Sequence, residues 1–235
     1  MSDSDSFALA AGDRSLLPDS KLPRRQVLAD GVYETIKSLI MDHWLVPGSR
    51  INMDALAREL DVSATPVREA LARLDADGLV TKRPLAGYMT APLLDAVAFE
   101  HLYEMRMLLE PDAARLAAAR ITGADLADLA TELDEAEQQP PGDAYATYRV
   151  FADRDAAFHH GIASAAGNPL LRDAVARLRA HMHVYRLYFR AGIAVDTMRE
   201  HQRIFGALRD GNPEMAARAM TAHVRSSRER LVRFV

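Results

Sequence analysis

The chain has no cysteine among its 235 residues. It therefore has no disulfide framework, no zinc site built on thiolates and no cysteine nucleophile. It also has no apolar run long enough to span a bilayer. The first 22 residues lack the basic start and apolar core of a secretory signal, so we expect residues 1–22 to form a flexible tail. Together these absences predict a cytoplasmic protein without a membrane anchor.

The sequence also lacks an excess of basic residues. Its formal net charge is −4, from 29 basic and 33 acidic residues. Residues 1–92 contain 11 basic and 13 acidic side chains, which leaves 18 and 20 for residues 93–235. Neither part is basic, so a surface that binds nucleic acid would be confined to a local patch. The length is compatible with one or two domains.

Residues 62–74 carry the most specific local pattern. Ser63 or Thr65 can cap a helix here, Pro66 suits its first turn, and Gly78 is suited to ending it. Apolar residues recur at i, i+3, i+4 and i+7 and form a single stripe that must be buried: Val67, Ala70, Leu71 and Leu74. The run therefore predicts the second helix of a helix-turn-helix.

The flanking residues predict the rest of a winged helix-turn-helix domain over residues 23–92. We expect helices over 28–43 and 53–60, the second capped by Asn52 or Asp54, and short strands over 79–83 and 88–90 around a turn at 84–87. A small helical domain with a hairpin and no nucleic-acid role is the alternative.

In a winged helix-turn-helix, the first turn of the second helix reaches base edges. We therefore expect Arg68 to bind guanine, and Ser63 and Thr65 to contact phosphate or base. The other candidate DNA-binding residues follow along the helix and the hairpin: Arg73, Lys82, Arg83 and Gly87.

Residues 56–80 resemble the winged helix of GntR-family transcriptional regulators, and the match extends over roughly residues 25–91. Its most specific part is Thr-Pro-Val-Arg-Glu-Ala-Leu at 65–71. The resemblance implies binding to double-stranded DNA at a palindromic operator by a homodimer, with one recognition helix per half-site. Ala64 stands where many members carry arginine, and the turn at 84–87 carries little charge.

Residues 93–235 predict an all-α antiparallel bundle of six or seven helices, so the fold class is mostly α. Proline and glycine mark the breaks, including Pro111 and residues 140–142, 167–169 and 211–213. The expected helices lie near 94–109, 111–120, 124–138, 144–165, 169–190, 195–210 and 213–233, and the first two form either one helix or two.

Four side chains of this bundle have the spacing of a metal site. Asp155 and His159 lie four residues apart and share a helix face. His201 and His223 are equidistant from the turn at Asn212, so they should lie level on adjacent antiparallel helices. Three imidazoles and one carboxylate suit a borderline divalent ion. The alternative is that each histidine has an ordinary packing or solvated role, as we expect for His43, His101, His160, His181 and His183.

Residues 99–233 resemble the FCD effector domain of the FadR branch of the GntR family, in segments such as 103–110, 155–162 and 166–171. In metal-binding members an aspartate, a histidine four residues later and two histidines on the last helices ligate the ion. The resemblance assigns these roles to Asp155, His159, His201 and His223. We expect a divalent transition metal, with zinc as the first choice and nickel or manganese as alternatives.

In that family the metal usually lies beneath a small organic ligand, often a carboxylate. Arg106 matches the family position that would bind the far end of such an effector. An ion pair between Arg106 and Glu110 is an equally weighted alternative. Four further effector-binding candidates lie on helices expected to border the cavity: Tyr103, Arg149, Tyr185 and Arg186.

The two patterns together predict a DNA-binding transcriptional repressor controlled by a small organic acid at a metal site, and not an enzyme. Two alternatives stay open. The first is a regulator that senses the metal ion itself. The second is a metal-dependent enzyme, because three histidines, an aspartate and an open position also occur in hydrolytic sites.

Overall fold

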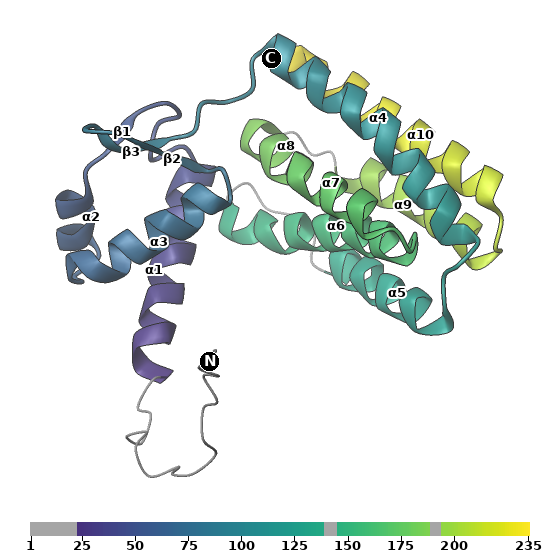
Figure 1. Cartoon of the computed structure of the whole chain (residues 1–235), viewed down its shortest axis with the longest axis horizontal. Helices are drawn as coiled ribbons and strands as arrows, with labels where there is room; N and C mark the ends of the chain where they lie inside the picture. The colour runs from purple at the N-terminus through teal and green to yellow at the C-terminus, as the bar shows by residue number, and fades with distance from the viewer. Residues whose placement is uncertain (1–22, 139–144, 189–193) are drawn as a thin grey trace, which may run out of the picture.

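The computed structural model describes residues 23–138, 145–188 and 194–235. Within these residues, a smaller N-terminal part with a short sheet precedes a larger all-helical part, and residues 91–95 link them (Figure 1). This architecture confirms the predicted fold class. The expected tail, residues 1–22, lies outside the described residues.

The N-terminal part is a winged helix-turn-helix. Its strands pair antiparallel in the order β1-β3-β2, with Val80 opposite Thr90 and Arg83 opposite Gly87. The two-residue strand β1 was not predicted, because so short a segment has no periodicity to detect. The elements are α1 (Pro23–Met41), β1 (Arg50–Ile51), α2 (Met53–Glu59), α3 (Ala64–Ala76), β2 (Val80–Arg83) and β3 (Gly87–Thr90).

Local chemistry explains where these helices begin and end. Asn52 caps α2, since its Oδ1 accepts a hydrogen bond of 3.0 Å from the backbone N–H of Ala55. Ser63 occupies the N-cap position of α3, although its hydroxyl makes no capping bond. After α3, Gly78 adopts a φ of +74°, which lets the chain turn sharply into β2.

The C-terminal part is a bundle in which α4 packs along α10, and α5 packs on α6. Its main apolar core is formed by side chains of α4, α5, α6, α9 and α10, among them Phe99, Phe158 and Leu208. The elements are α4 (Ala96–Ala118), α5 (Gly123–Gln138), α6 (Tyr145–Ala165), α7 (Pro169–Leu178), α8 (Ala180–Tyr188), α9 (Ala194–Arg209) and α10 (Pro213–Leu231), followed by a 3-10 turn (Val232–Phe234).

The structure decides the helix boundary at Pro111, which the sequence leaves open, and contradicts the single helix predicted over 169–190. A break at Pro111 does not occur, because α4 continues through it with buried side chains on both sides, including Arg106 and Ala114. Conversely, the single helix expected over 169–190 is divided at Arg179, whose φ is +48°. Nothing in the local sequence signals this break, because Arg179 is neither glycine nor asparagine.

The two parts of the chain share one apolar cluster. Tyr145, Tyr148 and Phe151 of α6 belong to the same buried cluster as Ile36 of α1 and Leu71 of α3. In addition, Asp42 accepts a hydrogen bond of 2.8 Å from the backbone N–H at the start of α6. The N-terminal part is therefore packed against the bundle. Among the described helices, none combines the length and apolarity needed to cross a bilayer.

Candidate nucleic-acid interface and metal centre

The first turn of α3 presents polar side chains to solvent. Thr65 and Arg68 are exposed, as is Ser63 at the N-cap. The opposite face is fully buried, as the apolar stripe predicted, and it includes Val67 and Leu74. The three polar residues that sequence analysis placed on DNA therefore share the accessible end of the second helix of the motif.

Arg73 lies in a different environment. Its Nη1 lies 2.5 Å from Oδ1 of Asp30, and its guanidinium carbon lies 4.1 Å from the centre of the Tyr33 ring. Both partners belong to α1, so the contacts of Arg73 lie within the domain. The guanidinium of Arg73 therefore contacts α1, in contrast to the exposed side chains at the start of α3.

The hairpin supplies the remaining predicted DNA contacts. Lys82 and Arg83 are exposed on β2. Gly87 lies opposite Arg83 and has a φ of +81°, a conformation that glycine adopts without strain. Leu85, at the tip of the turn, is fully exposed. The wing therefore carries two cations at its base and an apolar tip.

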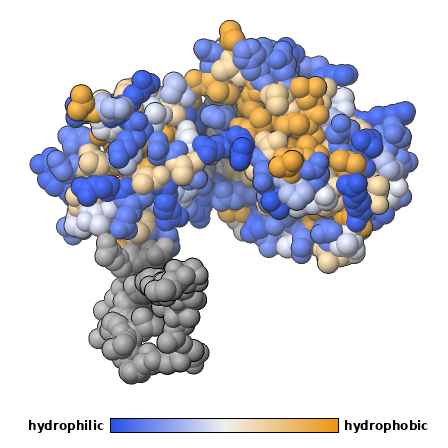
Figure 2. Space-filling view, in the orientation of Figure 1, coloured by the Kyte–Doolittle hydropathy of each residue, from blue (hydrophilic) through white to orange (hydrophobic). Residues whose placement is uncertain are grey.

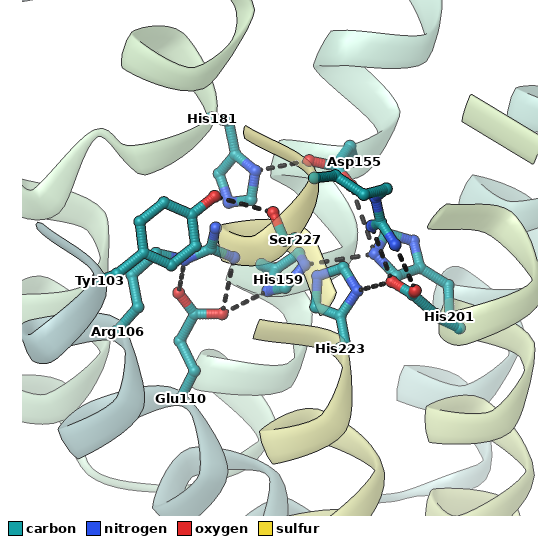
Figure 3. Close-up of polar contacts among 11 residues, drawn as sticks. Tyr103, Arg106, Glu110, Asp155, His159, His181, His201, His223 and Ser227 are labelled. Atoms are coloured by element: carbon teal, nitrogen blue, oxygen red, sulfur yellow. Dashed lines mark hydrogen bonds and ion pairs between the residues drawn. The ribbon is translucent and has the colours of Figure 1, made fainter. Parts of the chain in front are cut away.

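The four predicted metal ligands meet inside the bundle (Figure 3). Asp155 and His159 come from α6, His201 from α9 and His223 from α10, and all four are buried. The rings of His201 and His223 have centroids 4.8 Å apart, so they are level as the spacing predicted. The Nε2 atoms of His159 and His201 are 3.3 Å apart, and Oδ1 of Asp155 lies 3.2 Å from Nε2 of His201.

Two carboxylates determine which nitrogen of each ring faces the centre. Nδ1 of His223 hydrogen-bonds to Glu200 at 2.8 Å, and Nδ1 of His159 lies 2.8 Å from Oε2 of Glu110. An ionised carboxylate only accepts hydrogen bonds, so in each ring the nitrogen that faces the carboxylate, Nδ1, carries a proton. The lone pairs of Nε2 in His159 and His223 are then directed at the other members of the cluster, as in metal sites where a carboxylate orients the ligand.

The protonation states also suit a cation. Burial lowers the pKa of His201 well below its ordinary value and also lowers the pKa of His223, which keeps both rings neutral. Burial alone would raise the pKa of Asp155, but the surrounding histidines, His181 foremost, hold it well below its usual range. The Oδ1 atom of Asp155 is buried and has no hydrogen-bond partner among the described residues. Two neutral imidazoles, those of His201 and His223, beside an anionic carboxylate oxygen fit a divalent transition metal.

A second layer of ionic contacts surrounds the cluster. Glu200 pairs with Arg230 through both carboxylate oxygens, at 2.6 and 3.0 Å, while it orients His223. Burial opposes the charge of Glu200, but these two partners lower its pKa. On the other side, burial opposes the charge of Glu110, and Arg106 with His159 holds the pKa of Glu110 well below its usual range.

His181 is a member of the cluster that sequence reasoning missed. It comes from α8, and its Nδ1 lies 2.5 Å from Oδ2 of Asp155. With Asp155 and His159 it forms a second group whose ligand atoms lie within 4.8 Å of one another. Its position in the sequence has no spacing relation to the other ligands, which is why an ordinary role was expected.

The effector-binding candidates have diverse surroundings. Arg106 makes the predicted ion pair with Glu110, with bonds of 2.6 and 3.2 Å, and both side chains are buried. The hydroxyl of Tyr103 hydrogen-bonds to Ser227 at 2.7 Å. Both lie beside the histidine cluster (Figure 3).

The other candidates are not brought to the cluster. Arg149 pairs with Glu34 of α1 at 2.8 Å. Arg186 donates to the carbonyl oxygen of Ala91 at 2.5 Å, in the linker between the two parts. The side chain of Tyr185 lies outside the described residues.

Comparison with known proteins covers both parts of the chain. The model of the family described as bacterial regulatory proteins, gntR family, matches residues 28–89, and the model of the FCD domain matches residues 101–226. The Nta operon transcriptional regulator of Aminobacter aminovorans is 31% identical over 80% of this chain and 87% of its own. The galactonate operon transcriptional repressor of Escherichia coli is 26% identical over 86% and 96%. The solved structure of E. coli McbR/YncC, 23% identical, has a TM-score of 0.64 over 88% of this chain and 97% of its own, and shares the fold.

Proposed function

Because the chain belongs to the GntR family of bacterial transcriptional regulators and carries an FCD domain, we propose that a small organic acid at a metal centre controls its operator affinity. The metal centre would consist of Asp155, His159, His201 and His223. The single observation that carries this proposal is the buried Oδ1 of Asp155, which accepts no hydrogen bond from the described residues and lies 3.2 Å from Nε2 of His201 among the converging imidazoles.

The donor set supports a cation at the centre of the cluster. Two Nε2 atoms lie 3.3 Å apart, and Glu110 contacts Nδ1 of one of these two rings, that of His159. Nε2 of His201 also lies 3.2 Å from Oδ1 of Asp155, so a proton on this nitrogen or a metal ion among the three atoms would satisfy them together. Three nitrogens and one oxygen suit zinc first, and nickel or manganese as alternatives. Such an ion supplies a Lewis-acid position that binds an anionic ligand.

A carboxylate is the effector class that fits this centre. Arg106 is a buried cation on α4, and its pairing with Glu110 shows that its guanidinium accommodates a carboxylate through two nitrogens. An effector with two anionic or polar ends would reach the metal with one end and Arg106 with the other. Tyr103, whose ring lies 5.2 Å from the Arg106 guanidinium carbon, adds a hydroxyl on the same side.

The exposed start of α3 is the sequence-reading surface. Arg68 would bind guanine in the major groove, with Ser63 and Thr65 on phosphate or base. Lys82 and Arg83 of the wing would contact phosphates, and Gly87 allows the wing backbone to approach the DNA closely.

An exposed apolar stripe on α4 supports a homodimer. Val97, Met105 and Leu108 lie on one side of this helix, and the first and last are 63% and 67% exposed. Figure 2 shows apolar side chains gathered on the C-terminal part in the region of α4. Exposed apolar patches commonly mark the surfaces through which proteins associate. Light scattering should give the mass of a dimer for the native chain and of a monomer for Leu108→Glu, whereas a monomeric native chain would contradict the proposal.

The test of the metal centre compares two histidines. Purified native protein should contain about one divalent ion per chain, as measured by inductively coupled plasma mass spectrometry. His223→Ala should lose most of it, because one of four ligands is removed, whereas His101→Ala, an exposed histidine of α4, should retain it. Full occupancy in His223→Ala would exclude His223 from the ligand set. Operator binding that follows metal concentration without any acid would favour the metal-sensing alternative.

A further inference from the structure

Helix α8 contacts both functional parts of the molecule. At its first turn, His181 lies 2.5 Å from Asp155 of the histidine cluster. One residue before α8, Arg179 reaches the end of α3. Near the other end, Arg186 contacts the linker at Ala91 and Pro92. Figure 1 shows α8 on the side of the bundle that faces the N-terminal part.

The contact of Arg179 is made at the C-terminus of the second helix of the motif. Its Nη2 donates a hydrogen bond to the carbonyl oxygen of Ala76, the last residue of α3. Its Nη1 occupies the space beside Gly78, where a Cβ would collide with the guanidinium. The last carbonyls of a helix have no intrahelical partner and carry the negative end of the helix dipole, so a cation at this point is favourable.

The backbone at Arg179 shows that the surroundings impose this arrangement. Its φ of +48° lies in the left-handed region, which is unfavourable for a residue with a Cβ. This turn separates α7 from α8 and directs the arginine toward α3. Such backbone strain persists where tertiary contacts over-determine the conformation.

The linker contact fixes the other end of α8. Arg186 is 1% exposed and donates to two successive linker carbonyls, at 2.5 Å for Ala91 and 3.2 Å for Pro92. Burial lowers the pKa of Arg186 to about 10, so it remains a cation at neutral pH. The backbone carbonyl oxygen of Arg186 also lies 2.8 Å from Nε2 of His43, which is the second residue after the end of α1. The helix is thus bonded to the DNA-binding part at both ends.

His181 joins this helix to the metal centre. It shares the carboxylate of Asp155 with the cluster, since Oδ2 faces His181 while Oδ1 lies 3.2 Å from Nε2 of His201. On its other side it lines a cavity of about 220 Å³ between the two parts of the chain, together with Tyr33 and Asp77. His181 therefore lies between the carboxylate of Asp155 and an open space beside α8.

We propose that Arg179 is a positioning residue for DNA recognition, and that α8 transmits the state of the Asp155 carboxylate to the end of α3. The positioning role of Arg179 depends only on its hydrogen bond to the carbonyl oxygen of Ala76. The transmission through α8 rests on the proposed function, because it requires that the histidine cluster binds a metal. Arg179 lies at the break directly before α8, and His181 lies in the first turn of α8.

The test uses hydrogen exchange on the full chain, with zinc as the probe. The peptide covering residues 74–80 reports the end of α3, where the N–H groups of Gly78 and Leu79 bond to the carbonyls of Asp75 and Leu74. The native protein, Arg179→Ala and Arg179→Lys are compared in the metal-stripped and zinc-loaded forms. Arg177→Ala, an exposed arginine on the last turn of α7, is the matched control.

In the stripped form, Arg179→Ala should exchange about two- to fivefold faster over residues 74–80, as expected for loss of a cation at a helix end. Arg179→Lys should restore most of the protection, and Arg177→Ala should match the native chain. Zinc should alter exchange of this peptide in the native chain but not in Arg179→Ala, in which peptides of α6 and α10 should still respond.

Two results overturn the inference separately. Exchange in stripped Arg179→Ala equal to that of Arg177→Ala contradicts the positioning role. An unchanged zinc response over residues 74–80 in Arg179→Ala contradicts the transmission through α8. If the native chain binds no zinc, the proposed function and the transmission fail, and the stripped forms still decide the role of Arg179.

Discussion

The two arginines of α3 lie in different surroundings. Both are exposed in part and only five residues apart, and sequence analysis assigned both to DNA. Arg68 lies in the first turn on the solvent side, whereas Arg73 is paired with Asp30 and stacked on Tyr33 of α1. We therefore assign base recognition to Arg68 and internal packing of the winged helix to Arg73.

Arg68→Ala should lower affinity for the selected operator by about 1–3 kcal/mol, which is about 5- to 150-fold, and should relax specificity at one base pair per half-site. Metal content and thermal stability should not change, since the side chain is exposed. Arg73→Ala should instead lower the melting temperature and spare base preference. Fluorescence anisotropy against a library of single-base operator variants measures both effects, and an unchanged base preference in Arg68→Ala would contradict the assignment.

The buried histidines predict how the stability of the metal-stripped protein depends on pH. Burial lowers the pKa of His201 and His223 in the folded chain, and unfolding returns them to about 6.5. Below that pH the unfolded chain binds more protons, so the free energy of unfolding decreases as the pH falls, by up to about 1.4 kcal/mol per pH unit for each histidine. The lowered pKa of Asp155 acts in the same direction, but only below about pH 4.

The measurement is the melting temperature of the stripped protein between pH 7.5 and 5.5. It should fall across this range, and His201→Gln should make the slope shallower because one titrating group is removed. A melting temperature independent of pH would show that folding does not lower the pKa of these histidines, because the folded and unfolded chains would then bind equal numbers of protons.

At the scale of helices, local patterns located most elements but not their interruptions. The stripe at Val67 and Leu74 fixed the buried face of α3, and the turn at Asn212 placed α9 and α10 at matching heights. Pro111 and Arg179 show the limits of such patterns. A proline normally ends a helix, and an arginine normally continues one, yet the structure reverses both. In each case distant contacts outweigh local preference.

Pro111→Ala should stabilise the protein. The continuous helix α4 lacks the hydrogen bond that residue 111 would donate, and a proline inside a helix costs up to about 3 kcal/mol. Because Pro111 is only partly buried, alanine can restore that bond with little change in packing. Thermal unfolding should show a raised melting temperature, and a lowered one would indicate that the ring of Pro111 is needed for packing.

The candidate site was predictable to the extent that its residues share a helix or a hairpin. Asp155 and His159 follow from helical spacing, and His201 and His223 from symmetry about one turn. His181 does not, because it comes from a separate helix whose placement depends on the break at Arg179. Glu200 was missed for a related reason, since only the packing of α9 on α10 brings it to His223 and Arg230.

At the scale of the whole molecule, the two parts are physically continuous. The apolar cluster of the winged helix extends into the first half of α6, and the second half of the same helix carries Asp155 and His159. The histidine cluster is therefore connected to the winged helix through packed side chains as well as through the contacts of α8. Control of operator affinity then requires that effector and operator affect one another's binding by the same factor.

The most direct test of this account is operator binding in the presence of small carboxylic acids, measured by anisotropy with zinc-loaded and metal-stripped protein. The operator is first selected from random DNA. At least one acid should change operator affinity by about 5- to 150-fold in the zinc-loaded form and have no effect in the stripped form. An acid that acts equally on both forms, or operator binding that responds to zinc and to no acid, would contradict the account.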